Sequence, residues 1–204
     1  MNNIKVEIMK RKKQIIPIVS VYIRKWPFDT TEDIFPEERL LEIDNATNLK
    51  VKGQKFYAWK LLEYAMSEEF GLDLSDSGLK KDSSKWCSSK CEFSISHTGD
   101  FVAVAVSTHK VGVDIEECDE QRFDRLKTKI VHPKEQAIEG ISLCKLWTDK
   151  EALFKKSNKR NFVPNKINTI GSNVYHQYLT LDGKKFSLSV ATDLLQSVKI
   201  NIID

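Results

Sequence analysis

The chain has no long hydrophobic run of the kind that crosses a membrane. Nowhere in its 204 residues does an apolar stretch reach the ~20 residues that a transmembrane helix needs. The apolar segment 15–23 follows basic residues, as in a signal peptide, but Pro17 interrupts it and no small-residue cleavage site follows. We therefore expect a cytoplasmic protein with no membrane partner, in which this segment begins a first strand.

The chain also lacks a strong excess of charge of one sign. Its 32 Lys and Arg residues and 29 Asp and Glu residues give a net charge of +3. Nucleic-acid-binding proteins usually carry a larger and more clustered basic excess, so we expect no nucleic acid among the partners. A mildly basic chain instead suits an anionic small molecule and an acidic protein partner.

Cysteines are few, and they do not complete a zinc-binding pattern. Cys87 and Cys91 could begin a zinc site together with His97 or His109. No second closely spaced pair of Cys or His residues completes such a site. Reduced thiols are therefore the expected state in the cytosol.

The chain does contain a pair of carboxylates on one face of a predicted strand. The segment Val-Gly-Val-Asp-Ile-Glu-Glu at 111–117 alternates between apolar and other residues, which is typical of a strand. Asp114 and Glu116 then share a face with Gly112, roughly 6.5–7 Å apart along the strand, so both can reach one cation. Gly112 leaves that face open for close approach. Taken alone, the pair could equally form the solvated face of an edge strand.

A later segment adds a third carboxylate and a lysine. Glu151 lies at the edge of an apolar stripe with helical spacing, where a carboxylate is costly unless it is paired or bound to a metal. Lys155 follows one helical turn later, and alone the two could form an ordinary surface ion pair. Together, the three carboxylates and the lysine indicate a divalent-metal site for phosphate chemistry. The stripe consists of Leu143, Leu146, Trp147, Leu153 and Phe154.

A third segment places a histidine before the acidic strand. Residues 93–99, Phe-Ser-Ile-Ser-His-Thr-Gly, alternate, with His97 on the apolar face and the serines on the other. Segment 101–106 is apolar on both faces, which is typical of a buried central strand. We therefore predict a three-stranded meander that ends in the acidic strand. His97 then lies at the exit of its first strand, in the same sheet as the carboxylates, where it can contact a phosphate.

The order of these three segments resembles the 4′-phosphopantetheinyl transferase superfamily, and the two-domain, surfactin-synthetase-activating type fits best. The resemblance covers roughly residues 90–156, and three motifs in the right order match by chance far more rarely than one. Members transfer 4′-phosphopantetheine from coenzyme A to a serine of an apo acyl or peptidyl carrier protein and release 3′,5′-ADP. The resemblance thus implies a transferase that depends on Mg²⁺, or on Mn²⁺, and we expect a monomer.

The resemblance also implies roles for individual residues. Lys155 would pair with a phosphate oxygen of coenzyme A, and His97 would hydrogen-bond another phosphate. Glu151 is the candidate general base, acting directly or through a metal-bound water. Lys85 stands in Ser-Lys-Trp, where members often carry Gly-Lys-Pro, and is a further candidate phosphate contact. The metal ligands would be Asp114, Glu116 and Glu151.

One partial match to the family and one departure from it concern the contacts to the nucleotide end of coenzyme A. Members often carry a basic helix start in the first half, and here three lysines, at 50, 52 and 55, lie near a predicted helix start. The glycines that often follow the catalytic helix are missing from segment 157–160. The resemblance therefore does not identify the residues that would contact the nucleotide end of coenzyme A.

The pattern strand, helices, strands occurs twice along the chain. We expect an α+β fold of two similar α/β subdomains, residues 1–109 and 110–204, packed with pseudo-two-fold symmetry. The second subdomain would carry most metal ligands, and the resemblance implies a cofactor cleft between the two. The expected strands lie near 15–24, 92–117 (the meander), 167–178, 184–191 and 196–203, and the expected helices near 36–44, 54–70, 120–130, 133–139 and 142–157.

Two other functions fit part of the pattern. A metal-dependent phosphohydrolase would use the same carboxylates to activate water, and it would release phosphate without a carrier. A non-catalytic module that binds coenzyme A or a carrier is the other alternative. Such a module would not need to keep three carboxylates and a lysine together.

Overall fold

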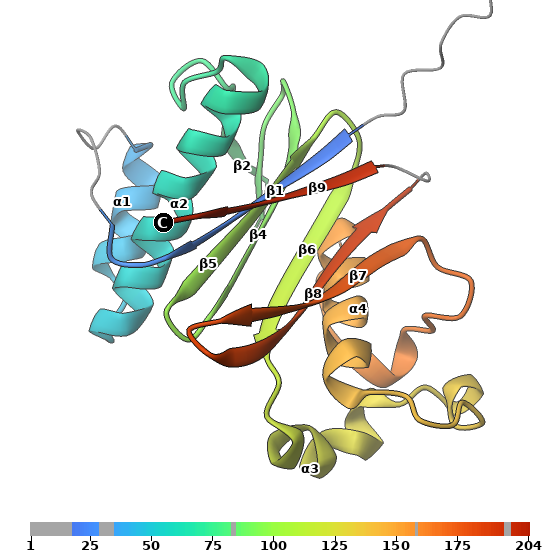
Figure 1. The fold of residues 1–204 in the computed structure, drawn as a ribbon. Coiled ribbons are helices and arrows are strands. Elements are labelled where there is room, and N and C mark those ends of the chain that lie inside the picture. Colours follow the sequence, from blue (N-terminus) through green and yellow to red (C-terminus); the bar gives the residue numbers. More distant parts are fainter. Residues whose placement is uncertain (1–17, 29–34, 83–84, 158, 194–196) are drawn as a thin grey trace, which may run out of the picture.

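The computed structural model describes residues 18–28, 35–82, 85–157, 159–193 and 197–204, which fold into a mixture of helices and strands (Figure 1). This agrees with the expected α+β class. Within the described ranges, no helix is both long and apolar enough to span a bilayer. The helices are α1 (Glu37–Asp44), α2 (Leu49–Phe70), α3 (Glu120–Ile130) and α4 (Leu143–Lys156). The strands are β1 (Ile18–Lys25), β2 (Lys80–Asp82), β3 (Lys85–Cys87), β4 (Glu92–Thr98), β5 (Phe101–Ser107), β6 (Val111–Glu117), β7 (Val174–Leu181), β8 (Lys184–Thr192) and β9 (Ser197–Ile203).

The first sheet has four strands in the order β4–β5–β1–β9. β5 is buried along its whole length, as its continuous apolar sequence predicts. Val102, Val104 and Val106 face α2, whereas Phe101 and its alternate neighbours face the second sheet. The last strand of the chain, β9, pairs in parallel with the first, β1.

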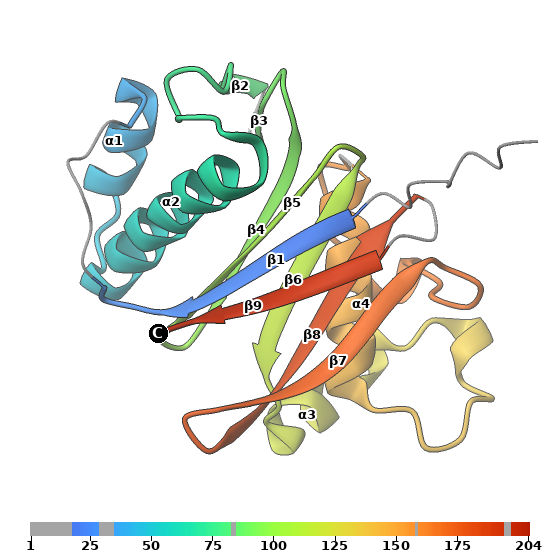
Figure 2. The same cartoon turned by 45° about the horizontal axis from the view of Figure 1, so that its top comes forward.

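The second sheet has the order β6–β8–β7 and packs face to face on the first. Val111, Val113 and Ile115 of β6 point into the apolar layer between the sheets. The opposite face of β6 packs against α4, so that α2 and α4 cover opposite sides of the two sheets (Figures 1 and 2). This arrangement places Asp114 and Glu116 on the side of α4.

The predicted three-stranded meander is wrong in its third strand, because β6 belongs to the second sheet. β5 already has β4 on one edge and β1 on the other, which leaves no edge for β6. β6 instead contacts β4 through side chains: the amide of Val113 donates to Ser94 Oγ (3.0 Å), and that of Ile115 donates to Ser96 Oγ (3.3 Å). The alternating serines therefore join the two sheets, and β4 stays next to the acidic strand.

Removing the hydroxyl group of Ser94 should measurably weaken this junction. In Ser94→Ala the buried amide of Val113 loses its acceptor, so the free energy of unfolding should fall by about 1–3 kcal/mol. Urea denaturation measures this change, with Ser75→Ala at an exposed position as the control. Equal midpoints for the two variants would show that the serine contact does not stabilise the junction.

Several predicted boundaries shift. α2 begins at residue 49 rather than near 54, because the side chain of Asn48 accepts a hydrogen bond from the amide of Lys50 and caps the helix. The helix expected at 133–139 is a single 3₁₀ turn, Pro133–Glu135. The strand expected from 167 begins at Val174. The expected first strand begins at residue 15, and residues 15–17 lie outside the described residues.

Candidate functional site

The fold brings three carboxylates together at the contact between β6 and α4. One oxygen each from Asp114, Glu116 and Glu151 lies within 4.8 Å of the other two. Across the ranges that the structure describes, no other group of three Asp, Glu, His or Cys side chains is close enough to share an ion. The possible zinc site that begins at Cys87 and Cys91 therefore does not form among these residues.

A close backbone contact at Gly112 positions the helix that carries Glu151. A Cβ atom added at Gly112 would lie 2.0 Å from the carbonyl oxygen of Ala152 and 2.7 Å from the amide nitrogen of Lys156. The close approach that the sequence predicts is therefore made by the backbone of α4. Because Asp114 and Glu116 share this face with Gly112, the helix brings Glu151 next to them.

The buried face of α4 differs from the predicted apolar stripe. Trp147 and Phe154 are only partly buried and pack against Phe162 on the outer side of the helix. The inner side meets serines of β8, and Ser189 Oγ donates to Asp149 Oδ1 over 2.7 Å. Polar partners on the sheet explain why this helix buries polar side chains. The buried residues of α4 are Cys144, Leu146, Thr148, Asp149, Lys150 and Ala152.

Asp114 is the most deeply buried member of the trio. Its Oδ1 accepts hydrogen bonds from Ser96 Oγ and from Lys155 Nζ, both at 2.7 Å, whereas its buried Oδ2 has no hydrogen-bond partner. Burial raises the pKa of Asp114 to about 7, although the charge of Lys155 opposes the shift. A buried carboxylate oxygen without a donor has the chemistry of a metal ligand, so the site fits a hard divalent cation.

Glu116 and Glu151 are held by different partners. Glu116 accepts hydrogen bonds from Thr98 Oγ1 (3.1 Å) and from both terminal nitrogens of Arg122 (3.1 and 3.3 Å). Lys155 Nζ lies 3.5 Å from Glu151 Oε1, so its ammonium group lies between Glu151 and Asp114. Burial opposes the charged form of Lys155, but these two carboxylates raise its pKa and keep it charged.

Sequence reasoning missed Arg122, which lies in the first turn of α3. The sequence feature that could have helped to place Arg122 is Asp119. Its side chain accepts a hydrogen bond from the amide of Arg122, which caps α3 and fixes where the helix starts. The separation of six residues from Glu116 follows neither strand nor helix periodicity. A pattern search along one element could not pair the two residues.

A basic cavity of about 470 Å³ lies beside the trio, and Lys155 lines it. His97 and Lys85, the two other predicted phosphate contacts, line the same cavity, and Lys85 Nζ also donates to the carbonyl oxygen of Lys155 (2.8 Å). Burial away from bulk water lowers the pKa of His97, and the positive charge of Lys155 lowers it further. Further basic residues in the lining are Arg39, Lys55, Lys159 and Arg160.

Among these, Arg39 has no sequence signal of its own. It lies in α1 with its guanidinium group over the ring of Trp59, 5.0 Å from the ring centroid, and donates to Glu42 (2.7 Å). Of the three lysines near the start of α2, only Lys55 lines the cavity. The lining therefore combines residues from both halves of the chain.

The raised pKa of Asp114 predicts a specific pH dependence of stability in metal-free protein. The folded state holds the proton up to about pH 7, whereas the unfolded state releases it near 3.8. This group therefore stabilises the fold below about pH 4, and its contribution is lost as the pH rises to about 7. Asp114→Asn has no carboxyl group to ionise, so it should not lose stability in this way. Its advantage, the melting temperature of the variant minus that of the wild type, should therefore grow from pH 4 to 7. An advantage that is constant with pH in EDTA would contradict the assignment.

Comparison with known proteins gives a partial similarity. No protein-family model matches the chain. The 4′-phosphopantetheinyl transferase gsp of Aneurinibacillus migulanus is 34% identical over 79 residues, which are 35% of this chain and 33% of the relative. The matched segment thus spans about a third of the length of that relative. The similarity suggests the phosphopantetheinyl transferase superfamily and, more broadly, a transferase.

Proposed function

We propose that this chain transfers the 4′-phosphopantetheine group from coenzyme A to a serine of an apo acyl or peptidyl carrier protein, releasing 3′,5′-ADP. One observation carries the proposal: Lys155 pairs with two carboxylates of the acidic trio and also lines the basic cavity. A cation site and an anion site therefore adjoin each other. That combination suits a substrate with a pyrophosphate group, which needs both a metal ion and basic side chains.

The basic cavity would bind coenzyme A through its phosphates. Lys155 and Lys85 offer ammonium groups, which act on phosphate oxygens as point charges. His97, with its lowered pKa, is neutral at pH 7 and can donate one hydrogen bond without adding charge. Lys159 and Arg160 line the cavity just beyond α4, in the segment where family members often carry glycines. They would contact the nucleotide end of coenzyme A.

The acidic trio would hold Mg²⁺, or Mn²⁺, through Asp114, Glu116 and Glu151. When bound, the ion supplies positive charge that offsets the charge developing on the leaving phosphate. Glu151 is the candidate base, because its side chain is 25% exposed whereas that of Asp114 is 2% exposed. Its carboxylate would accept the proton of the attacking serine. Arg122 and Thr98 would keep Glu116 oriented toward the other two carboxylates.

The finer type is part of the same proposal. Residues 1–109 and 110–204 would form the two similar subdomains of the surfactin-synthetase-activating type, related by pseudo-two-fold symmetry, with coenzyme A in the cleft between them. The mixed lining of the basic cavity supports this, since His97 and Lys85 come from the first range and Lys155 from the second. We further propose that the protein acts as a monomer in the cytoplasm.

A product analysis tests the proposal against its two alternatives. The full chain is incubated with coenzyme A, Mg²⁺ and a panel of apo-carriers, and the carriers and nucleotides are analysed by mass spectrometry. We expect one carrier to gain a phosphopantetheine group, with 3′,5′-ADP released in equal amount. Release of inorganic phosphate without a carrier would instead identify a phosphohydrolase. Binding of coenzyme A without any product would identify a non-catalytic module.

A further inference from the structure

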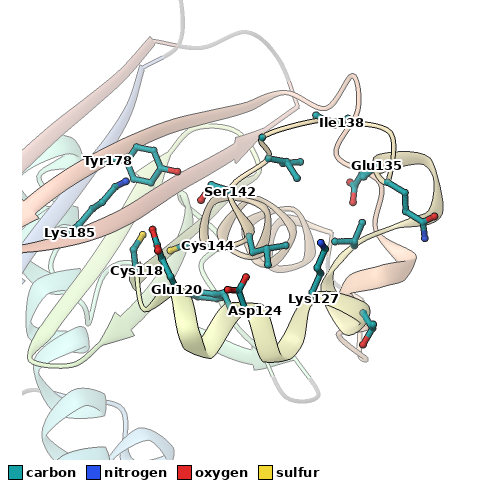
Figure 3. Close-up of a pocket in the computed structure, with 17 residues that line it drawn as sticks. Cys118, Glu120, Asp124, Lys127, Glu135, Ile138, Ser142, Cys144, Tyr178 and Lys185 are labelled. Carbon is teal, nitrogen blue, oxygen red and sulfur yellow. The ribbon is translucent and has the colours of Figure 1, made fainter.

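A larger cavity, of about 730 Å³, lies between α3 and the segment that leads into α4 (Figure 3). None of the three carboxylates of the trio lines it, and the proposed function does not use it. Two cysteines line it from different elements: Cys118 directly follows β6, and Cys144 lies in the first turn of α4. Both are free thiols.

The two thiols lie at the wall of this cavity and belong to the same packed cluster. Their side chains pack in one apolar cluster with Phe123 and Leu146, and both line the same cavity. Figure 3 shows both sulfur atoms at the same side of the cavity. Cys144 is buried, with 6% of its surface exposed, whereas Cys118 is half-buried. Two cysteines that share one packed cluster can form a disulfide once their sulfur atoms approach to about 2 Å.

We propose that Cys118 and Cys144 form a redox-active dithiol site that reacts with low-molecular-weight disulfides entering through the cavity. Cys118, the more accessible of the two, loses its proton to solvent and attacks one sulfur of the small disulfide. A mixed disulfide forms, and the other sulfur leaves as a thiol after taking up a proton. Cys144 then attacks Cys118, and the second small thiol leaves in the same way. The two cysteines are oxidised, and the small disulfide is reduced to two thiols.

The resulting disulfide would join the two elements that carry the acidic trio. Cys118 lies two residues after Glu116, and Cys144 lies two helical turns before Glu151 on α4. The bond would close a loop of about 25 residues and so restrict the unfolded chain. The oxidised protein should therefore melt at a higher temperature than the reduced protein.

Disulfide mapping of the full chain tests the proposal. The protein is incubated with oxidised glutathione, free thiols are alkylated, and linked peptides are identified by mass spectrometry. We expect a link between Cys118 and Cys144, with Cys87 and Cys91 recovered as alkylated thiols. Recovery of Cys118 and Cys144 as alkylated thiols, or a stable glutathione adduct on Cys118 in the wild type, would overturn the proposal.

Two variants test the order of the steps. Cys144→Ser removes the second thiol, so Cys118 should retain one glutathione as a stable mixed disulfide. Cys87→Ser is the matched control, because Cys87 does not line this cavity, and it should form the internal disulfide as the wild type does. Absence of glutathione from Cys118 in Cys144→Ser would overturn the assignment of Cys118 as the attacking thiol.

Discussion

Glu151→Gln should lower the rate of phosphopantetheine transfer at least ~10²-fold, because it removes a negative ligand and the candidate base from a site that acts on developing charge. The same change should leave the melting temperature unchanged or raise it. Among the described residues, the cation that pairs with Glu151 is Lys155, at 3.5 Å, and Lys155 keeps its shorter contact with Asp114. A partly exposed ion pair of this kind contributes little to stability. Transfer rates at saturating coenzyme A and Mg²⁺, with thermal melts of both proteins, measure the two effects.

Glu139→Gln is the matched control for this experiment. Glu139 is an exposed carboxylate in the segment before α4, and it is not part of the acidic trio. It undergoes the same chemical change and should keep the wild-type rate. If Glu151→Gln melted far below the wild type, Glu151 would be a structural residue. A normal transfer rate in Glu151→Gln would equally contradict its place in the site.

Gly112→Ala should be among the most destabilising single changes in the chain. The new Cβ atom would meet backbone atoms of α4 at 2.0 and 2.7 Å, and backbone cannot rotate away as a side chain can. Forcing the helix from β6 should cost more than about 3 kcal/mol of unfolding free energy. Because Glu151 sits on that helix, any folded fraction should also lose divalent-cation binding. Urea denaturation and calorimetric cation titration measure the two losses.

Gly53→Ala separates the backbone clash from the general cost of a larger residue. Gly53 lies within α2, and a Cβ atom there would approach a ring atom of Trp26 at 2.7 Å, a side chain that can shift. Alanine also favours the helix by about 1 kcal/mol relative to glycine. We therefore expect a much smaller loss for Gly53→Ala. Equal losses in the two variants would show that the contact between β6 and α4 is not tight.

Much of the fold follows from local patterns in the sequence. Alternation at 111–117 predicts which side chains of β6 face the apolar layer, and the apolar run in β5 predicts its full burial. The sheet to which β6 belongs could not be predicted, because it depends on β1, far away in the chain, occupying the second edge of β5. The parallel pairing of β9 with β1 is likewise a contact between opposite ends of the chain.

The carboxylates of the site could be found from the sequence, but their supporting residues could not. Asp114 and Glu151 stand out because each is a charge where apolar neighbours are expected. Ser96 and Arg122 are ordinary polar residues, and only the packing of three elements brings them to the carboxylates. The buried polar face of α4 was also hidden, since its partners are serines on a strand about 40 residues later.

Manganese binding tests most directly the central claim that Asp114, Glu116 and Glu151 form one divalent-cation site. Electron paramagnetic resonance follows free Mn²⁺ as the protein is titrated at pH 8, above the raised pKa of Asp114. We expect one bound ion per wild-type chain and a large loss of affinity in Asp114→Asn, which keeps the size of the side chain but not its charge. Unchanged Mn²⁺ binding in Asp114→Asn, or no binding by the wild type, would contradict the account.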